Sequence, residues 1–210
     1  MRLIVFDMDG VLTKEKSSWN FVHKALNVDN SKNFELYKSG KISYHEFFKL
    51  DIDLWVKKYK KINKNVIIEI LKRIELQDDI DDLGKFLNEN NVIAAIVSGG
   101  IYWLADIINK RLKFNEIYAN KIFTDDNGYI INDGEIMVDP LKKDNVIRSI
   151  ERIYDIKKED TISIGDSYSD ISMKNASRKF ISFNGDKLTN SMADYSVNSI
   201  KELIDVINSI

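Results

Sequence analysis

The chain has 210 residues, of which 44% are hydrophobic and 30% charged, a composition typical of one folded domain or one domain with an insertion. Its 31 Lys and Arg against 33 Asp and Glu leave a net charge of -2, which argues against a general nucleic-acid-binding protein. It has no Cys and only two His, so disulfides, thiolate metal sites and a cysteine nucleophile are excluded, and any catalysis falls mainly to carboxylates.

No stretch of the sequence predicts a membrane segment. The apolar run 3–6 is much shorter than the core of a signal peptide and ends at Asp7. No later run approaches the ~20 apolar residues that a membrane helix needs. We therefore expect a cytoplasmic protein that binds neither membranes nor nucleic acid, and the sequence leaves its oligomeric state open.

Short apolar runs alternate with amphipathic segments along the chain. The runs typical of strands buried on both faces cover residues 3–6, 93–97, 161–164 and 180–183. Apolar residues at helical spacing predict helices over residues 79–90, 102–114, 144–154 and 199–210. This alternation predicts the α/β class, with a doubly wound, Rossmann-like parallel sheet as its core.

Two segments interrupt the alternation. Between the first strand and the helix over 79–90, patterns at 19–26, 44–59 and 65–76 are helical without any strand. We interpret residues 15–77 as an inserted α-helical cap, and residues 1–14 plus 78–210 as the core. Residues 117–138 contain the turn signals 126–128 and 132–134 and predict a small β-hairpin.

The first strand ends in an acidic motif, Asp7-Met8-Asp9-Gly10. In an extended chain Asp7 and Asp9 point to the same side, because side chains alternate with period two. They would lie at the carboxyl edge of a parallel sheet, where open α/β folds bind ligands. Two neighbouring carboxylates repel unless a cation lies between them, so the motif predicts a cation site. The alternative is two polar residues that merely close a strand.

A second acidic pair follows a later strand. The run 161–164 leads to Asp166, and Asp170 follows four residues later. A helix that begins between them would place both carboxylates on one side. A simple helix cap is the alternative for Asp170.

Hydroxyl, glycine and lysine residues lie at other expected strand and helix ends. The run 93–97 is followed by Ser98 and Gly99, and a hydroxyl with free backbone N–H groups before a helix makes a phosphate cradle. Lys142 and Lys143 precede the helix that leads to the strand over 161–164. An ordinary turn and solvated lysines are the alternatives.

Together these residues resemble the haloacid dehalogenase (HAD) superfamily of phosphohydrolases. Asp7-Met8-Asp9-Gly10-Val11 is similar to its first motif, Ser98 to its second, Lys143 to its third and Gly165–Asp170 to its fourth. The resemblance spans the whole chain. The helical insert looks like the C1-type cap of the phosphoserine-phosphatase-like branch.

The resemblance implies a Mg2+-dependent phosphatase that hydrolyses a small-molecule phosphate ester through an aspartyl-phosphate intermediate. It implies that Asp7 is the nucleophile and that Asp9 is the general acid and base. It also implies that Asp7, the main-chain carbonyl of Asp9 and Asp166 bind the metal, with Asp170 in support.

The resemblance further implies a phosphate-binding set. This set consists of Ser98, the Gly99 amide and Lys143, with Lys142 as the rival lysine.

The cap is expected to select the substrate. Phosphoserine phosphatases usually have Ser-Thr after the second acid, where this chain has Gly10-Val11. Their cap arginine, which faces the substrate carboxylate, aligns with Asp51, with Lys49 nearby. Glu15 and Lys16 straddle the expected position of the cap acid that receives the substrate amine. Glu15, Lys49 and Asp51 are therefore candidate substrate-selecting residues, and phosphoserine itself is left open.

Other functions stay open at this stage. Within the same superfamily they are a sugar-phosphate phosphatase, a nucleotide phosphatase and a phosphotransferase that passes the phosphoryl group to an alcohol. The non-enzymatic alternative is a receiver-like phospho-switch module. Receivers lack a large cap after the first strand, so the chain fits that class poorly.

Overall fold

The computed structural model describes all 210 residues and contains one seven-stranded sheet. The strands are β1 (Arg2–Phe6), β2 (Val92–Ile101), β3 (Glu116–Thr124), β4 (Ile130–Glu135), β5 (Thr161–Gly165), β6 (Lys179–Phe183) and β7 (Tyr195–Val197). Their order is β4-β3-β2-β1-β5-β6-β7, and every neighbouring pair is parallel except β3 and β4. The predicted doubly wound α/β class is confirmed.

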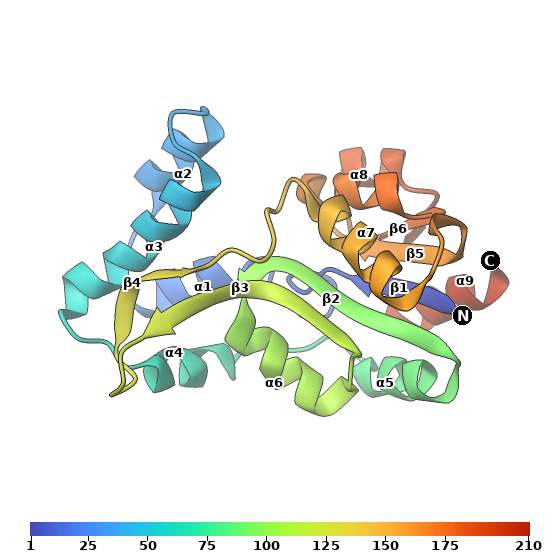
Figure 1. Ribbon diagram of the computed structural model, residues 1–210, viewed down its shortest axis with the longest axis horizontal. Helices are drawn as coiled ribbons and strands as arrows, with labels where there is room; N and C mark the ends of the chain where they lie inside the picture. The colour runs from blue at the N-terminus through green and yellow to red at the C-terminus, as the bar shows by residue number, and fades with distance from the viewer.

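Helices cover both faces of the sheet (Figure 1). One face carries α5 (Ile80–Glu89), α6 (Tyr102–Leu112) and α9 (Ile200–Ser209). The other carries α7 (Lys143–Tyr154), the 3-10 helix η2 (Tyr168–Ala176) and α8 (Lys187–Met192), and a short 3-10 turn, η1 (Lys158–Asp160), precedes β5.

Strand β1 is apolar throughout because it packs on both layers of helices. Ile4 and Phe6 belong to the apolar core with α5, α6 and α9, whereas Leu3 and Val5 belong to the core with α7. This alternation is the period of two that a strand imposes on its side chains. A strand buried on both faces needs this unbroken apolar run, which is why the sequence reveals it.

Four helices fill the segment between β1 and α5. They are α1 (Ser18–Ala25), α2 (Ser31–Lys38), α3 (Tyr44–Tyr59) and α4 (Lys64–Leu71). Helices α2 and α3 project beyond the sheet edge, while α4 lies beside α6 (Figure 1). All four fall within residues 15–77, and the division of the chain at those two points stays a prediction.

The structure corrects two expectations within the insert. Helix α2 was not predicted, because it buries no residue and so shows no apolar stripe. Helix α4 ends at Leu71 instead of continuing to Leu76, which instead forms an isolated bridge with Thr13.

The predicted hairpin is formed by β3 and β4, which pair antiparallel. Its turn contains Gly128 at φ 79°, as the first turn signal predicts. The second turn signal, 132–134, was a wrong prediction, since these residues lie inside β4. Gly134 serves a close approach there: a Cβ atom on it would lie 2.2 Å from the Lys121 carbonyl oxygen and 2.7 Å from the Phe48 ring.

None of the helices combines the length and the apolar composition that crossing a bilayer requires. The cytoplasmic location stays a prediction.

Candidate active site

The sheet register brings three chain segments to one edge. Phe6, the last residue of β1, pairs with Ile96 of β2 and with Ile164 of β5. The next residues along each strand therefore meet at the carboxyl edge, where Asp7 donates its backbone N–H to the Ile164 carbonyl at 2.9 Å. This is the edge at which open α/β sheets bind ligands.

The chain leaves β1 through a tight turn at residues 8–12. Gly10 has φ 79°, a left-handed conformation that favours glycine. A Cβ atom on Gly10 would also lie 2.2 Å from Oδ2 of Asp166. The turn therefore needs glycine both for its backbone conformation and for the space that Asp166 occupies.

Asp7 and Asp9 do not follow the strand alternation that the sequence predicted, because the turn begins at Met8. Asp9 faces α1, where its Oδ2 accepts hydrogen bonds from the backbone N–H of Ser18 at 2.8 Å and from its hydroxyl at 2.7 Å. The other oxygen, Oδ1, is buried without a partner. Both carboxylates nevertheless line the same cavity.

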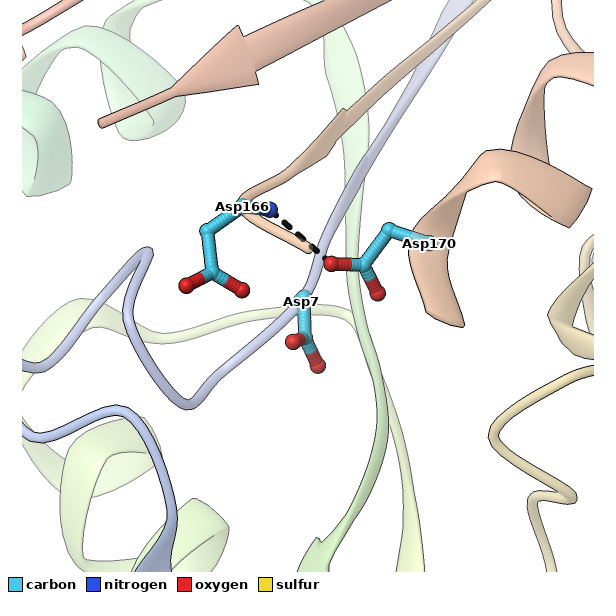
Figure 2. A group of neighbouring side chains, drawn as sticks. All are labelled: Asp7, Asp166 and Asp170. Carbon is cyan, nitrogen blue, oxygen red and sulfur yellow. Dashed lines mark hydrogen bonds between the residues drawn. The ribbon is translucent and has the colours of Figure 1, made fainter. Parts of the chain in front are cut away.

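Three buried carboxylates converge at this edge (Figure 2). Asp7, Asp166 and Asp170 each offer one oxygen, and these oxygens lie within 4.8 Å of one another. Asp170 belongs to the first turn of η2, and its Oδ2 accepts from the backbone N–H groups of Asp166 at 2.9 Å and Ser167 at 3.0 Å. Asp170 thus caps the helix and lies in the cluster as well.

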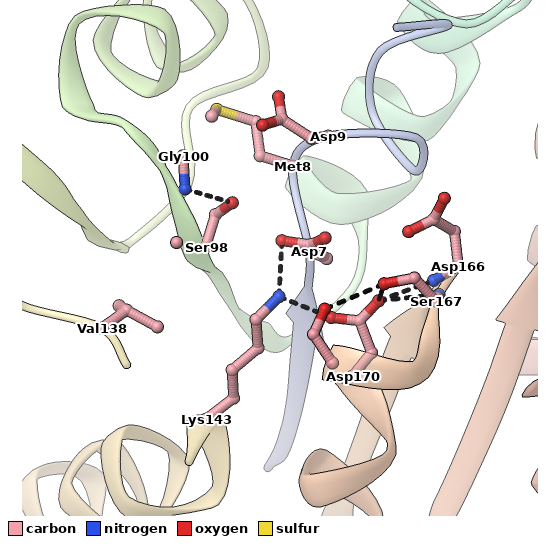
Figure 3. A network of polar contacts seen from close by, with 12 residues as sticks. Asp7, Met8, Asp9, Ser98, Gly100, Val138, Lys143, Asp166, Ser167 and Asp170 are labelled. Carbon is pink, nitrogen blue, oxygen red and sulfur yellow. Dashed lines mark hydrogen bonds and ion pairs between the residues drawn. The ribbon is translucent and has the colours of Figure 1, made fainter. Parts of the chain in front are cut away.

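Lys143 inserts its ammonium group into the carboxylate cluster (Figure 3). Its side chain is 2% exposed, and its Nζ lies 2.8 Å from Oδ1 of Asp7 and donates a hydrogen bond to Oδ1 of Asp170. Lys142 is exposed and pairs with Asp139 instead. Of the two rival lysines, the structure brings Lys143 to the site.

Burial and neighbouring charges shift the pKa values of these groups. It raises the pKa of Asp7 to about 7; the Asp170 charge raises it too, while Lys143 opposes the shift. Burial also raises the pKa of Asp9 to about 6, opposed by the two hydrogen bonds from Ser18. Burial alone would lower the pKa of Lys143, but the charges of Asp170 and Asp7 outweigh it and raise that pKa.

Lys16 is a residue of the site that the sequence analysis missed. Its Nζ donates to Oδ2 of Asp166 at 2.7 Å and to the Asn184 carbonyl at 3.1 Å. Burial raises the pKa of Asp166, and Lys16 opposes that shift. The sequence placed Lys16 beside the expected cap acid, but a lysine in a chain with 31 Lys and Arg gives no signal that it pairs with Asp166.

The end of β2 supplies Ser98 and Gly99. Ser98 is 2% exposed, and its hydroxyl accepts from the Gly100 backbone N–H at 3.1 Å. The Gly99 carbonyl accepts from Trp19 of α1 at 3.1 Å, from the Tyr44 hydroxyl of α3 at 3.3 Å and from a third donor, Asn120 of β3, at 3.1 Å. These three donors were also missed, because their link to Gly99 exists only in the folded chain.

Residues of the carboxylate cluster and residues of the helical insert line one cavity of about 640 Å3. The predicted residues in its wall are Asp7, Asp9, Asp51, Ser98, Gly99, Lys143 and Asp166. Asp170 is fully buried behind this wall. A second hollow, of about 810 Å3 near α4 and α5, contains none of the predicted site residues.

The structure separates two of the candidate substrate-selecting residues from the cavity. Lys49 is not in its wall and instead pairs with Asp133 of β4 at 3.1 Å. Glu15 is also outside the wall, and its neighbour Lys16 lines the cavity instead. Only Asp51 of the three faces it.

Comparison with protein families gives one match over most of the chain: a family model described as haloacid dehalogenase-like hydrolase matches residues 4–174. A phosphoserine phosphatase of Archaeoglobus fulgidus is 27% identical over 200 residues, covering 93% of this chain and 56% of that protein. A phosphoserine phosphatase of Methanocaldococcus jannaschii is 24% identical over 211 residues, covering 98% and 97%. The chain thus spans about half of the first relative and nearly all of the second.

Solved structures show the same fold. One is described as a phospho-aspartyl intermediate analogue of phosphoserine phosphatase, with a TM-score of 0.80, 23% identity and 98% coverage of both chains. An apo phosphoserine phosphatase also has a TM-score of 0.80, with 22% identity and coverage of 97% of this chain and 98% of that one. The chain therefore shares its overall fold, including the helical insert and the sheet, with these solved structures.

Proposed function

The chain belongs to the haloacid dehalogenase-like hydrolase family, and from this premise we propose that it is a phosphatase that hydrolyses a small-molecule phosphomonoester. The observation that carries the proposal is the group of Asp7, Asp166 and Asp170 around the buried Lys143, at the sheet edge that opens into the cavity. Membership of a hydrolase family argues against the receiver-like alternative.

We propose that Asp7 attacks phosphorus, so that the bond from phosphorus to the leaving oxygen breaks and an aspartyl-phosphate forms. Asp9 would donate a proton to that oxygen, then take one from the water that releases inorganic phosphate and restores Asp7. A pKa of about 6 supports this pair of tasks for Asp9, because both protonation states are accessible near neutral pH.

The residues fit a hard divalent cation, and we propose Mg2+. The candidate ligand atoms of the cluster are carboxylate oxygens, as Mg2+ prefers, and a cation would relieve the repulsion that remains among these carboxylates. The proposed ligands are Asp7, the main-chain carbonyl of Asp9 and Asp166. When bound, the cation would neutralise charge on the transferring phosphoryl group.

Asp170 is proposed as a supporting residue and not as a ligand. Its Oδ2 is engaged by the backbone N–H groups of Asp166 and Ser167, and its Oδ1 accepts from Lys143. A carboxylate with both oxygens so occupied orients its neighbours.

Ser98, the Gly99 N–H and Lys143 are proposed to hold the phosphate oxygens. Support comes from the contacts of two of these residues: Lys143 is held between two carboxylates, and the carbonyl of Gly99 accepts three hydrogen bonds. Donors held in position before the reaction stabilise developing charge without reorganising.

Phosphate release from a panel of phosphomonoesters, with Mg2+ and with chelator, tests the function. We expect turnover that requires Mg2+ and falls by at least about a thousandfold in Asp7→Asn, because the amide cannot act as the nucleophile. Asp133→Asn, which changes a half-exposed carboxylate outside the cavity, is the matched control and should keep its activity.

An Asp7→Asn enzyme with full turnover would contradict the assignment of the nucleophile. Sugar phosphates and nucleotides in the panel test those two alternatives. Added alcohols test the phosphotransferase alternative, in which the phosphoryl group appears on the alcohol and not as free phosphate.

A further inference from the structure

Asp51 is a buried carboxylate in the wall of the active-site cavity. It lies on α3, is 2% exposed and faces the same cavity as the carboxylate cluster. Its Oδ2 contacts His23 Nε2 at 3.1 Å and accepts from Asn30 Nδ2 at 3.0 Å, and its Oδ1 accepts from Asn33 Nδ2 at 3.2 Å. No Lys or Arg forms an ion pair with it.

The charge on Asp51 is not compensated by His23. The indole N–H of Trp55 points at Nδ1 of His23, at 2.8 Å. Because an indole nitrogen only donates, Nδ1 carries no proton, so His23 is neutral and its single N–H, on Nε2, donates to Asp51. All three partners of Asp51 are therefore neutral donors to an anion.

A buried carboxylate without a cationic partner is costly unless a cation reaches it. Asp51 still has acceptor capacity, because its Oδ1 accepts only the one bond from Asn33. A cation could reach Asp51 through the cavity that its side chain lines.

Aromatic side chains form much of the wall on the insert side. They are Trp19, Phe34, Tyr37, Tyr44, Phe47 and Phe48. Their rings contact one another, with Tyr37 and Phe47 stacked at 5.0 Å and Trp19 edge-on to Phe48 at 5.4 Å. Aromatic faces attract cations, so this wall and Asp51 favour the same kind of group.

The lysines in the cavity wall do not create a site for an anionic group beside Asp51. Lys16 is paired with Asp166, and Lys143 is paired with Asp7 and Asp170. The third lysine in the wall, Lys38, is exposed at the end of α2. No buried cation of the insert is present to receive a substrate carboxylate.

We propose that Asp51 binds a cationic nitrogen on the leaving group, so that the enzyme prefers phosphate esters of amino alcohols that lack a carboxylate. This inference rests on the proposed phosphatase activity. A substrate carboxylate next to the amine, as in phosphoserine, would be repelled by Asp51.

Two matched substrate pairs test the proposal by kcat/KM. Ethanolamine phosphate and phosphoserine differ by one carboxylate, and choline phosphate and 3,3-dimethylbutyl phosphate differ by the replacement of a cationic nitrogen with carbon. We expect wild-type enzyme to prefer ethanolamine phosphate over phosphoserine, and an ammonium ester over its neutral analogue, by at least about tenfold. Ethanolamine phosphate can donate N–H hydrogen bonds to Asp51, whereas choline phosphate has a quaternary nitrogen without N–H groups. Comparing the two substrates therefore distinguishes hydrogen bonding to Asp51 from attraction to the aromatic wall.

Asp51→Asn should lower kcat/KM for the preferred ammonium ester much more than for 3,3-dimethylbutyl phosphate, because only the former loses a charge partner. Asp53→Asn is the matched control: it lies on the same helix, pairs with Lys57 and is not in the cavity wall. Circular dichroism checks that both variants fold. The substrate preferences of the wild-type enzyme test the proposal even if a variant does not fold.

Faster hydrolysis of phosphoserine than of ethanolamine phosphate would overturn the inference and point to Lys38 as a carboxylate receptor. Equal rates on choline phosphate and its carbon analogue, with no preference for the primary amine, would also overturn it. Both results leave the phosphatase intact, whereas no Mg2+-dependent hydrolysis of any ester would instead contradict the proposed function.

Discussion

Three buried aspartates of the cavity wall have different surroundings, and we propose different roles for them. Asp7 lies against a lysine and two further carboxylates, Asp9 against the backbone and hydroxyl of Ser18, and Asp51 against three neutral donors. The residue type alone says only that each can be an anion. The proposed roles, nucleophile for Asp7, acid and base for Asp9 and cation binder for Asp51, rest on what each carboxylate contacts in the folded chain.

Gly10 offers a direct test of space at the site. Gly10→Ala should cost about 1 kcal/mol for its left-handed backbone and, in addition, displace Asp166. Gly40→Ala is a matched control, because Gly40 has φ 71° with nothing within 4 Å of the added Cβ atom. Urea unfolding should show a lower free energy of unfolding in both variants. The Mg2+ concentration for half-maximal activity should rise only in Gly10→Ala. Equal behaviour of the two would contradict the crowding of Asp166.

At the scale of elements, the site depends on side chains that tie separate segments together. Asn120 of β3 is fully buried. The two N–H groups of its amide are shared among the Gly99 carbonyl, the Val138 carbonyl and the Tyr44 hydroxyl, while its Oδ1 accepts from the Val138 N–H. One side chain thus joins the end of β2, the segment after β4 and helix α3.

Asn120→Ala should destabilise the protein by about 2–3 kcal/mol, because it leaves the buried N–H and carbonyl groups of Val138 without their hydrogen-bond partner. Asn65→Ala, an exposed residue on α4, should change the free energy of unfolding by less than about 0.5 kcal/mol. Denaturant unfolding measures both. A loss in Asn120→Ala no greater than in the control would show that Asn120 does not hold these segments together.

The same scale explains what could be predicted from the sequence. Strands such as β1 and β5 were found because burial on both faces demands an apolar run. Helix α2 was missed because it buries nothing, and the Gly134 segment was misread because glycine serves close packing as well as turns. Asp7 and Asp166 follow strand ends and could be predicted, whereas Asn120 depends on contacts between distant segments.

At the scale of the whole molecule, the core gathers carboxylates that repel one another, and cation binding is expected to stabilise the fold. At a Mg2+ concentration 100 times its Kd, linkage gives about 2.7 kcal/mol, which a rise in Tm should reveal. Asp166→Asn should abolish the rise, because it removes a proposed ligand. Asp81→Asn, in the acidic hollow near α5, should retain it. A rise that survives in Asp166→Asn and is lost in Asp81→Asn would locate the cation in that hollow.

The hydrogen bonds to the Gly99 carbonyl link the helical insert to the sheet beside the proposed phosphate site. Two of the carbonyl's three donors, Trp19 and Tyr44, belong to the insert, and the third, Asn120, belongs to the sheet. If the insert swings outward, the peptide group beside the proposed phosphate site loses two hydrogen bonds at the moment that solvent enters. We therefore expect the phosphate site to be well ordered only while the insert encloses the substrate. An enzyme with the insert swung outward is expected to bind inorganic phosphate more weakly.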